Sequence, residues 1–212
     1  MKELKEGIIG VFKPQGISSF DVIRRLRKIT EIKKIGHAGT LDPLATGVLV
    51  VGLGTKACHN LSKITNKDKE YLAEIKLGAS SSTDDAEGEI KKQPNVLKPD
   101  LKEIKQCLNQ FLGKIEQKPP LYSAIKHQGQ PAYKLARQGQ TVVLKPRLVE
   151  LKQLEIKAYH WPCLKLRLIT GPGFYVRALA RDLGIKLKTK GYLSSLERTR
   201  VGDFKKESCF KI

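Results

Sequence analysis

The stretch Gly36-His37-Ala38-Gly39-Thr40-Leu41-Asp42-Pro43-Leu44-Ala45-Thr46-Gly47 is the most informative part of this sequence. Its glycines permit tight backbone geometry, and Pro43 restricts the chain directly after Asp42. The apolar run Val48–Val51 follows at once and indicates a buried strand. A rigid loop that holds one carboxylate just before a buried strand suits a positioned catalytic group. A single Asp before Pro is more often a turn former, so the interpretation depends on the rest of the chain.

The segments around this loop alternate between strand and helix patterns. Ser18 and Asp21 mark a helix start, with Ser18 as the N-cap. The expected strands are Gly7–Phe12, Val48–Val51, Glu70–Leu77, Val149–Tyr159 and Cys163–Thr170, and the expected helices run from Ser18 to about Ile29, from Thr55 to about Ile64, and over Asp100–Leu112 and Phe174–Leu183. Residues Gly78 to Pro99 are polar and are expected to form a long mobile connection. We therefore expect one mixed α/β (α+β) domain over residues 1–212.

The charge of the chain points to a polyanionic partner. Forty Lys and Arg face 21 Asp and Glu, which gives a formal net charge of +19. A field of this sign attracts nucleic acid or an anionic membrane surface. No apolar run is long enough to span a bilayer, and no basic amphipathic helix stands apart from the globular pattern. The four cysteines are far apart, which argues against a metal site or a disulfide framework. We expect a cytoplasmic protein that binds nucleic acid and has no membrane partner.

The whole Gly36–Gly47 stretch resembles the signature of the TruB family of pseudouridine synthases, which make the pseudouridine of the tRNA T-loop. Five further segments resemble family motifs and occur in the same order along nearly the whole chain. They are Gly7–Ser19, Lys69–Gly78, Pro119–Arg137, Gly173–Gly184 and Leu196–Phe204. A chance match of this many ordered motifs is very improbable.

The resemblance implies the pseudouridine synthase fold, a mixed and mostly antiparallel sheet with flanking helices and a basic RNA-binding insertion. It implies an isomerase that acts on the T-arm of tRNA, as a monomer and without a cofactor or a metal. The target base must leave its stack, at a cost of a few kcal/mol. Asp42 would be the catalytic carboxylate, and it would either attack C1′ or remove the C2′ proton. Both roles need the ionised form.

Five other positions match the substrate-binding residues of the family. Tyr71 would stack on the flipped uracil, and Tyr175 would support the base pocket. Arg177 would pair with the catalytic carboxylate, and Asp85 would join that charge network. His37 would occupy the place that the base leaves or stack in the T-loop. Without the family resemblance, each of them would be interpreted as an ordinary loop, strand or helix residue with no functional role.

The segment at about 118–147 resembles the family's RNA-binding insertion. Between Lys118 and Arg147 there are six Lys or Arg and no Asp or Glu, with tyrosines among them. Such cations suit phosphates, and the tyrosines could pack or stack on bases. The residues expected to bind RNA are Lys118, Lys126, Lys134, Arg137, Tyr122 and Tyr133. A solvated basic hairpin is the plainer alternative.

The chain departs from the family pattern in two places. Ser82 stands where the family usually has an Asp, which puts one contact of that loop in doubt. The match also ends near Ile212, where many relatives continue into a PUA-like domain, so we expect no such domain here.

Two other functions compete with this interpretation. A tRNA-binding or tRNA-folding protein without catalysis would share the charge, but it would have no chemical need for Asp42. The segment Gly52-Leu53-Gly54 with Ala57 imitates a dinucleotide-binding fingerprint, which is weak evidence on its own.

Overall fold

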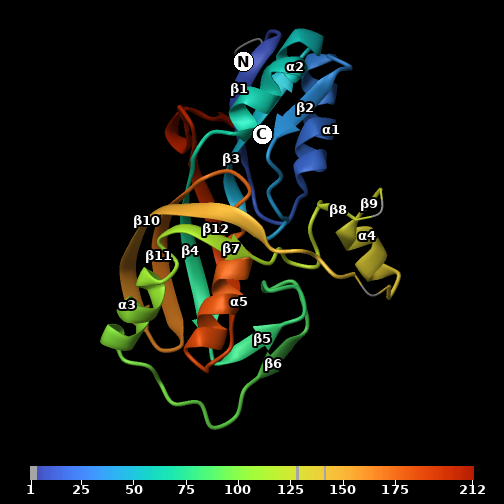
Figure 1. Cartoon of the computed structure of the whole chain (residues 1–212). Coiled ribbons are helices and arrows are strands. Elements are labelled where there is room, and N and C mark those ends of the chain that lie inside the picture. The colour runs from blue at the N-terminus through green and yellow to red at the C-terminus, as the bar shows by residue number, and fades with distance from the viewer. Residues whose placement is uncertain (1–3, 128, 141) are drawn as a thin grey trace. The chain divides into compact units, whose positions relative to one another are not determined.

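A computed structural model of the chain describes residues 4–127, 129–140 and 142–212 (Figure 1). The chain forms two compact units. The first contains the N-terminal part through Leu72, Leu168–Pro172 and Leu196–Ile212, and the second contains Ala73–Arg167 and Gly173–Ser195. The strand pairs are mostly antiparallel, with parallel pairing of β1 (Gly7–Lys13) to β14 (Phe210–Lys211) and of β3 (Thr46–Leu53) to β12 (Gly191–Val201). The expected mixed, mostly antiparallel sheet with flanking helices is confirmed.

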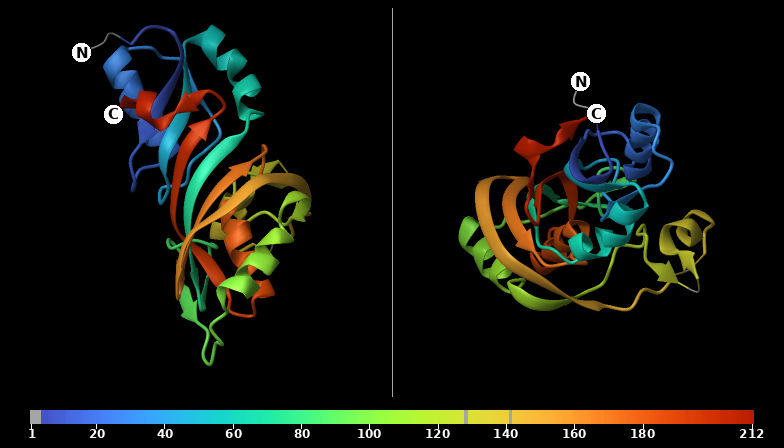
Figure 2. Two further views of the ribbon diagram at one scale, coloured as in Figure 1. Left: turned by 90° about the vertical axis from the view of Figure 1, so that its left-hand side faces the viewer. Right: turned by 90° about the horizontal axis from the view of Figure 1, so that it is seen from above.

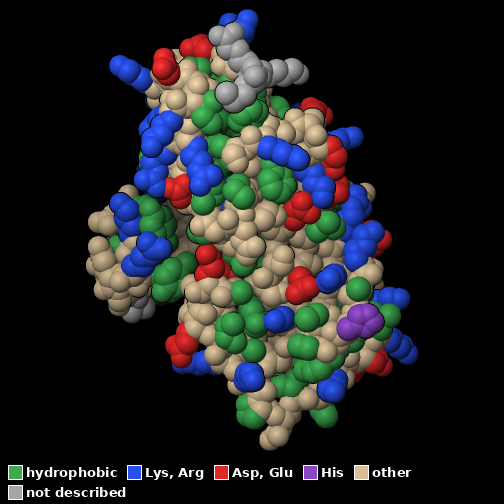
Figure 3. Space-filling model, turned by 180° about the vertical axis from the view of Figure 1, so that it is seen from behind, with side chains coloured by type: hydrophobic (Ala, Val, Ile, Leu, Met, Phe, Trp, Pro, Cys, Tyr) green, Lys and Arg blue, Asp and Glu red, His purple; other side chains and the backbone are tan. Residues whose placement is uncertain are grey.

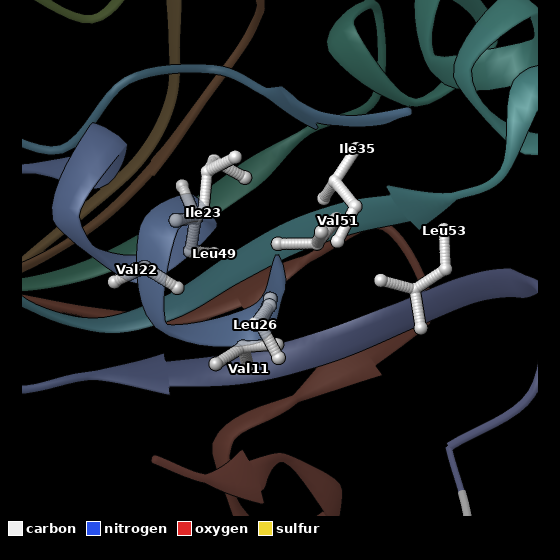
Figure 4. Close-up of a cluster of buried hydrophobic side chains, with 8 residues drawn as sticks. All are labelled: Val11, Val22, Ile23, Leu26, Ile35, Leu49, Val51 and Leu53. Atoms are coloured by element: carbon white, nitrogen blue, oxygen red, sulfur yellow. The ribbon is translucent and has the colours of Figure 1, made fainter. Parts of the chain in front are cut away.

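The first unit is built on β3 (Thr46–Leu53), which pairs antiparallel with β1 (Gly7–Lys13) and with β2 (Ile35–Ala38). The helices are α1 (Ser19–Thr30) and α2 (Thr55–Thr65). Alternate residues of a strand point to opposite faces of a sheet. Leu49, Val51 and Leu53 pack with α1 (Figure 4), whereas Val48 and Val50 pack with Leu61 of α2. Burial on both faces explains the continuous apolar run of the sequence.

The start of α1 has the capping arrangement that the sequence indicates. The Ser18 side chain accepts the Asp21 backbone N–H at 3.1 Å, and the Asp21 carboxylate accepts the Ser18 backbone N–H at 2.8 Å. This reciprocal pair satisfies two backbone donors at the helix end. The outer face of the helix is cationic, because Arg24, Arg25 and Arg27 are exposed.

The C-terminal part of the first unit contains a strand that the sequence analysis does not predict. It is the end of β12 (Gly191–Val201), which begins in the second unit and runs parallel to β3, with Arg198 opposite Gly47. The chain then forms β13 (Phe204–Lys205), a short 3₁₀ helix η1 (Lys206–Ser208) and β14 (Phe210–Lys211), and β14 pairs with β1.

The second unit has two helices on one face of its strands. Figures 1 and 2 show α3 (Leu101–Asn109) and α5 (Val176–Lys186) on the same side of β10 (Arg147–His160) and β11 (Cys163–Thr170). The unit also contains β7 (Gly113–Gln117), which pairs antiparallel with β10, and part of β4 (Lys69–Leu77). Its core side chains include Ile104, Leu108, Leu151, Leu164, Leu166, Leu179 and Leu183, all at most 1% exposed.

Residues 78–99 do not form the mobile connection expected from their polarity, and that expectation is wrong. They contain a hairpin of β5 (Ala79–Ser81) and β6 (Ile90–Lys92), with Ser81 opposite Ile90. Polar side chains order its turn, since Ser82 Oγ accepts the Glu89 N–H at 3.0 Å. Side-chain hydrogen bonds to the backbone can replace apolar burial in this way.

The basic segment near 118–147 contains β8 (Lys126–His127), β9 (Gln130–Pro131) and α4 (Ala132–Arg137). Figure 1 shows these elements, in yellow, set apart from the strands of their own unit. Ala132 and Leu135 are buried, and the Ala132 N–H donates to the Ile125 carbonyl at 2.8 Å, which ties α4 to the start of the segment. Among the residues that the structure describes, no helix has the length and apolar character to cross a membrane.

Candidate active site

Asp42 lies in the loop that joins β2 to β3, where residues 39–45 adopt neither helix nor strand. Its backbone carbonyl accepts the Ala45 N–H at 3.0 Å and closes a turn. The next carbonyl, of Pro43, accepts the Gly16 N–H at 2.9 Å, which ties the turn to the segment after β1. Asp42 is partly exposed, so a substrate can reach it while its backbone is fixed.

Two buried side chains hold the backbone on both sides of Asp42. Ser19, at the start of α1, accepts the Leu41 N–H at 2.9 Å and donates to the Leu41 carbonyl at 2.9 Å. Lys13 is fully buried at the end of β1, and its Nζ lies 3.4 Å from the Pro43 carbonyl oxygen. The loop is therefore ordered by the core beneath it.

Arg198 of β12 connects this loop to Tyr71 of β4. Its guanidinium donates to the Gly39 carbonyl at 3.0 Å and to the Thr40 carbonyl at 3.5 Å. Burial lowers the pKa of Arg198, whereas the Tyr71 hydroxyl and the Asp42 carboxylate both favour its charged form. Tyr71 is only 6% exposed. Asp42 and Tyr71 thus act on one buried cation.

His37 lies on β2, opposite Val51 of β3. Burial and the positive charge of Arg198 both lower the pKa of the imidazole, so its neutral form is favoured. Its Nδ1 is buried and has no hydrogen-bond partner within the described part of the chain.

Arg177 and Asp85 form a buried ion pair in the second unit. Arg177, in the first turn of α5, donates to Asp85 Oδ2 at 3.2 Å, and the side chains are 7% and 2% exposed. It also donates to the Tyr122 carbonyl at 2.9 Å. The other Asp85 oxygen accepts Thr83 Oγ1 at 2.5 Å and the Glu87 N–H at 3.0 Å. Asp85 therefore orders the turn of the β5–β6 hairpin as well as Arg177.

Tyr175 is positioned through its backbone by Gln117, a residue that the sequence analysis missed. Gln117 is 2% exposed at the end of β7. Its Oε1 accepts the Tyr175 N–H at 2.8 Å, and its Nε2 donates to the Tyr175 carbonyl at 3.0 Å. The amide thus fixes the residue that precedes α5.

A second arginine of α5, Arg181, was also missed. It donates to Asp84 Oδ2 at 2.8 Å, to Asp182 Oδ1 at 2.8 Å and to the Lys118 carbonyl at 2.7 Å. Residues i and i+4 share one face of a helix, so Arg177 and Arg181 stack along α5. Each binds one carboxylate of the hairpin turn and one carbonyl at the start of the basic segment. The four-residue spacing between Arg177 and Arg181 in the sequence already indicates that both arginines lie on one face of the helix.

The residues expected to bind RNA are mostly accessible. Lys118, Lys126, Lys134 and Arg137 are exposed, and Tyr122 and Tyr133 are partly buried. The Arg137 guanidinium lies 5.8 Å from the centre of the Tyr133 ring, so α4 presents a cation and an aromatic face together.

Of the proposed catalytic and substrate-binding residues, Asp42, His37 and Tyr71 belong to the first unit. Arg177, Tyr175 and Asp85 belong to the second.

Comparison with known proteins identifies the family. A family profile described as TruB family pseudouridylate synthase (N terminal domain) matches residues 27–176, which is most of the chain. The chain belongs to the TruB family. Members of the TruB family are isomerases that make pseudouridine, and the chain is accordingly a pseudouridine synthase.

Curated relatives of the TruB family match almost the whole chain. The tRNA pseudouridine synthase B of Protochlamydia amoebophila (strain UWE25) is 45% identical over 204 residues, covering 96% of this chain and 77% of the relative. The tRNA pseudouridine synthase B of Clostridium tetani is 42% identical, covering 97% of this chain and 71% of the relative.

Solved structures show the same fold. A Cbf5-Nop10-Gar1 complex contains a chain with a TM-score of 0.77 and 28% identity, covering 99% of this TruB-family chain and 53% of that chain. An H/ACA RNP bound to a substrate RNA gives a TM-score of 0.71 at 26% identity, covering 97% of this chain and 50% of that one. This chain thus spans about half the length of those proteins.

Proposed function

We propose that this protein isomerises the T-loop uridine (U55) of tRNA to pseudouridine, with Asp42 as the catalytic carboxylate. The observation that carries the proposal is the loop of Asp42, which is held by buried side chains and shares the buried cation Arg198 with Tyr71. The tRNA substrate is supported by the relatives at 42–45% identity, which are named tRNA pseudouridine synthase B. We propose that the protein acts on tRNA in the cytoplasm and as a monomer.

The reaction breaks the N1–C1′ bond of the uridine and forms a C5–C1′ bond, while the hydrogen on C5 leaves as a proton and N1 takes up a proton from water. Atoms and electrons balance within the substrate, so no oxidant or reductant is consumed. Asp42 serves either as the nucleophile at C1′ or as the base at C2′, and both roles use the carboxylate form. The neighbouring charge of Arg198 favours that form.

Tyr71 is the platform on which the flipped uracil stacks. Flipping a base costs a few kcal/mol, and an aromatic face recovers part of this cost through stacking. Because Tyr71 is nearly buried and lies beside Arg198, its ring needs little ordering when the base arrives. Arg177, Tyr175 and Asp85 are the substrate-binding residues of the second unit, where Asp85 pairs with Arg177 and Gln117 holds the Tyr175 backbone.

The basic segment captures the T-arm. Its cations contact phosphates, which gives affinity without sequence information. The face of the molecule in Figure 3 also carries many Lys and Arg side chains, as the net charge of +19 requires. Binding should therefore weaken steeply as salt rises.

The test uses an unmodified tRNA transcript tritiated at uracil C5, because isomerisation releases that tritium to water. The arms are wild type, Asp42→Asn and a matched control, Asp203→Asn, which changes an exposed carboxylate. Wild type and the control should release tritium from the T-loop uridine, and Asp42→Asn should release none. Binding of tRNA by wild type without release would refute the proposal and favour a tRNA-folding role. Release by Asp42→Asn at the wild-type rate would refute the role of Asp42.

A further inference from the structure

Arg198 is a large buried cation, and a buried charge needs compensation. It is 2% exposed, on a strand buried beside β3. Removing an arginine from water is unfavourable unless its donors are satisfied. Here they bind backbone carbonyls, namely Gly39 at 3.0 Å, Thr40 at 3.5 Å and Val48 at 2.8 Å. These hydrogen bonds offset the unfavourable burial of a charged residue beside the Asp42 loop.

The three carbonyls lie at the two ends of that loop. Gly39 and Thr40 precede Asp42, whereas Val48 belongs to β3, after the loop has ended. One rigid guanidinium therefore spans the entry and the exit of the loop. A planar fork fixes several acceptors in one geometry, which a lysine ammonium cannot do.

The main chain places Arg198 at this position. Arg198 pairs with Gly47 in the parallel β12–β3 ladder. A Cβ atom on Gly47 would lie 2.2 Å from the Arg198 carbonyl oxygen, and Gly47 has a φ of +104°. Only glycine allows this approach, so the two strands touch where the loop ends.

The same guanidinium also faces both proposed functional side chains of the first unit. The Tyr71 hydroxyl and the Asp42 carboxylate both interact with it. Lys69, two residues before Tyr71, adds a second buried cation, and its Cε would lie 3.7 Å from a Cβ on Gly39. A shift of Arg198 would consequently disturb the carboxylate and the stacking ring together.

We propose that Arg198 is a positioning residue of the isomerisation, which holds the Asp42 loop and the Tyr71 ring in one fixed arrangement before RNA binds. It touches neither the RNA nor the reacting atoms. The inference rests on the proposed function, and it adds a residue outside the set of substrate contacts. It therefore predicts that substitutions of Arg198 lower the rate of isomerisation in the protein–tRNA complex and leave the affinity for tRNA unchanged.

The experiment compares Arg198→Lys with Arg200→Lys, a matched change two residues along the same strand. Arg200 is partly exposed, donates to the Gly202 carbonyl at 3.1 Å and lies 3.6 Å from a Glu70 carboxylate oxygen, and neither partner belongs to the Asp42 loop. Single-turnover tritium release gives the rate of the bound complex, and filter binding gives the Kd for the tRNA transcript. Since a misplacement of about 1 Å can cost about 100-fold, we expect Arg198→Lys to lose about 10- to 100-fold in rate. Its Kd should stay within about twofold, and Arg200→Lys should match wild type in both.

Three results separate this proposal from its rivals. A folded Arg198→Lys with a rate within about threefold of wild type would overturn it. An equal loss in rate and in tRNA affinity would also overturn it, because Arg198 would then contact RNA. Absence of tritium release by wild type would instead remove the proposed function itself.

A second variant covers the case in which Arg198→Lys does not fold. Tyr71→Phe removes only the hydroxyl that faces the guanidinium. We expect its single-turnover rate to fall, with unchanged tRNA affinity and with faster amide hydrogen exchange at Leu41 and Ala45 in the loop. Wild-type exchange at these two amides would refute the link between Tyr71 and the loop through Arg198.

Discussion

Removal of the charge on Asp85 should destabilise the protein far more than the same change at Asp84. The two carboxylates are neighbours in the β5–β6 turn, and each binds one arginine of α5. The Arg177–Asp85 pair is 7% and 2% exposed, whereas the Arg181–Asp84 pair is 23% and 16% exposed. The pair of variants Asp85→Asn and Asp84→Asn thus isolates the effect of burial.

The expected magnitudes follow from this difference. Removing one partner of a buried ion pair typically costs 3–5 kcal/mol, and since Asn keeps one acceptor oxygen we expect about 3 kcal/mol for Asp85→Asn. For a chain of this size, 1 kcal/mol lowers the melting temperature by about 2–4 °C, so the loss corresponds to about 6–12 °C. At position 84, burial raises the pKa of the carboxyl above its usual value, so the ionised form is not favoured by folding. Asn also tolerates the φ of +62° found there, and we expect a change within about 1 kcal/mol.

The assay is urea unfolding at neutral pH, followed by circular dichroism, together with a thermal scan. The midpoint should fall for Asp85→Asn with an unchanged slope, which shows that stability and not the unfolded state has changed. Equal losses for the two variants, or a loss below about 1 kcal/mol for Asp85→Asn, would refute the assignment of the buried pair as the stabilising one.

Three further predictions concern the first unit and the backbone. Gly47→Ala should be severely destabilising, because the new Cβ would lie 2.2 Å from the Arg198 carbonyl oxygen. The control Gly113→Ala places its Cβ in open space and should cost only about 1–2 kcal/mol for its positive φ. Equal unfolding midpoints of the two variants in urea would contradict this prediction. Lys69 has its pKa lowered to about 8, first by burial, so the unfolded chain binds more protons between pH 8 and 10.5. The unfolding free energy of wild type relative to Lys69→Met should therefore rise with pH over that window. A difference in unfolding free energy that does not change with pH would contradict the lowered pKa of Lys69. Ser18→Ala should cost about 1 kcal/mol by removing the cap of α1, measured by thermal unfolding.

The sequence predicts those elements whose pattern is local. The run Val48–Val51 is apolar at every position because both faces of β3 are covered, and that strand is confirmed. The start of α1 is confirmed because its cap lies within four residues. The strand β12 was missed, since a fully buried arginine interrupts its apolar alternation. The β5–β6 hairpin was missed because polar side chains, and no apolar face, order its turn.

The candidate site was predicted unevenly for the same reason. Asp42, Tyr71 and Arg177 were identified through the family resemblance, since nothing local distinguishes them from ordinary polar residues. Arg198 was overlooked because its acceptors lie about 150 residues away in the sequence, and only the folded chain brings them together. Charge periodicity cannot reveal a side chain whose partners are backbone carbonyls of a distant loop.

The way in which the Asp42 loop is held has a consequence for protein engineering. The loop contributes little to its own order, because the groups that hold it come from three separate places, Lys13, Ser19 and Arg198. Grafting residues 36–47 onto another scaffold would carry the carboxylate but not its geometry. A transplant would also need the end of β1, the first turn of α1 and the end of β12, which carries Arg198. The smallest portable version of this chemistry is therefore a layered unit and not a peptide motif.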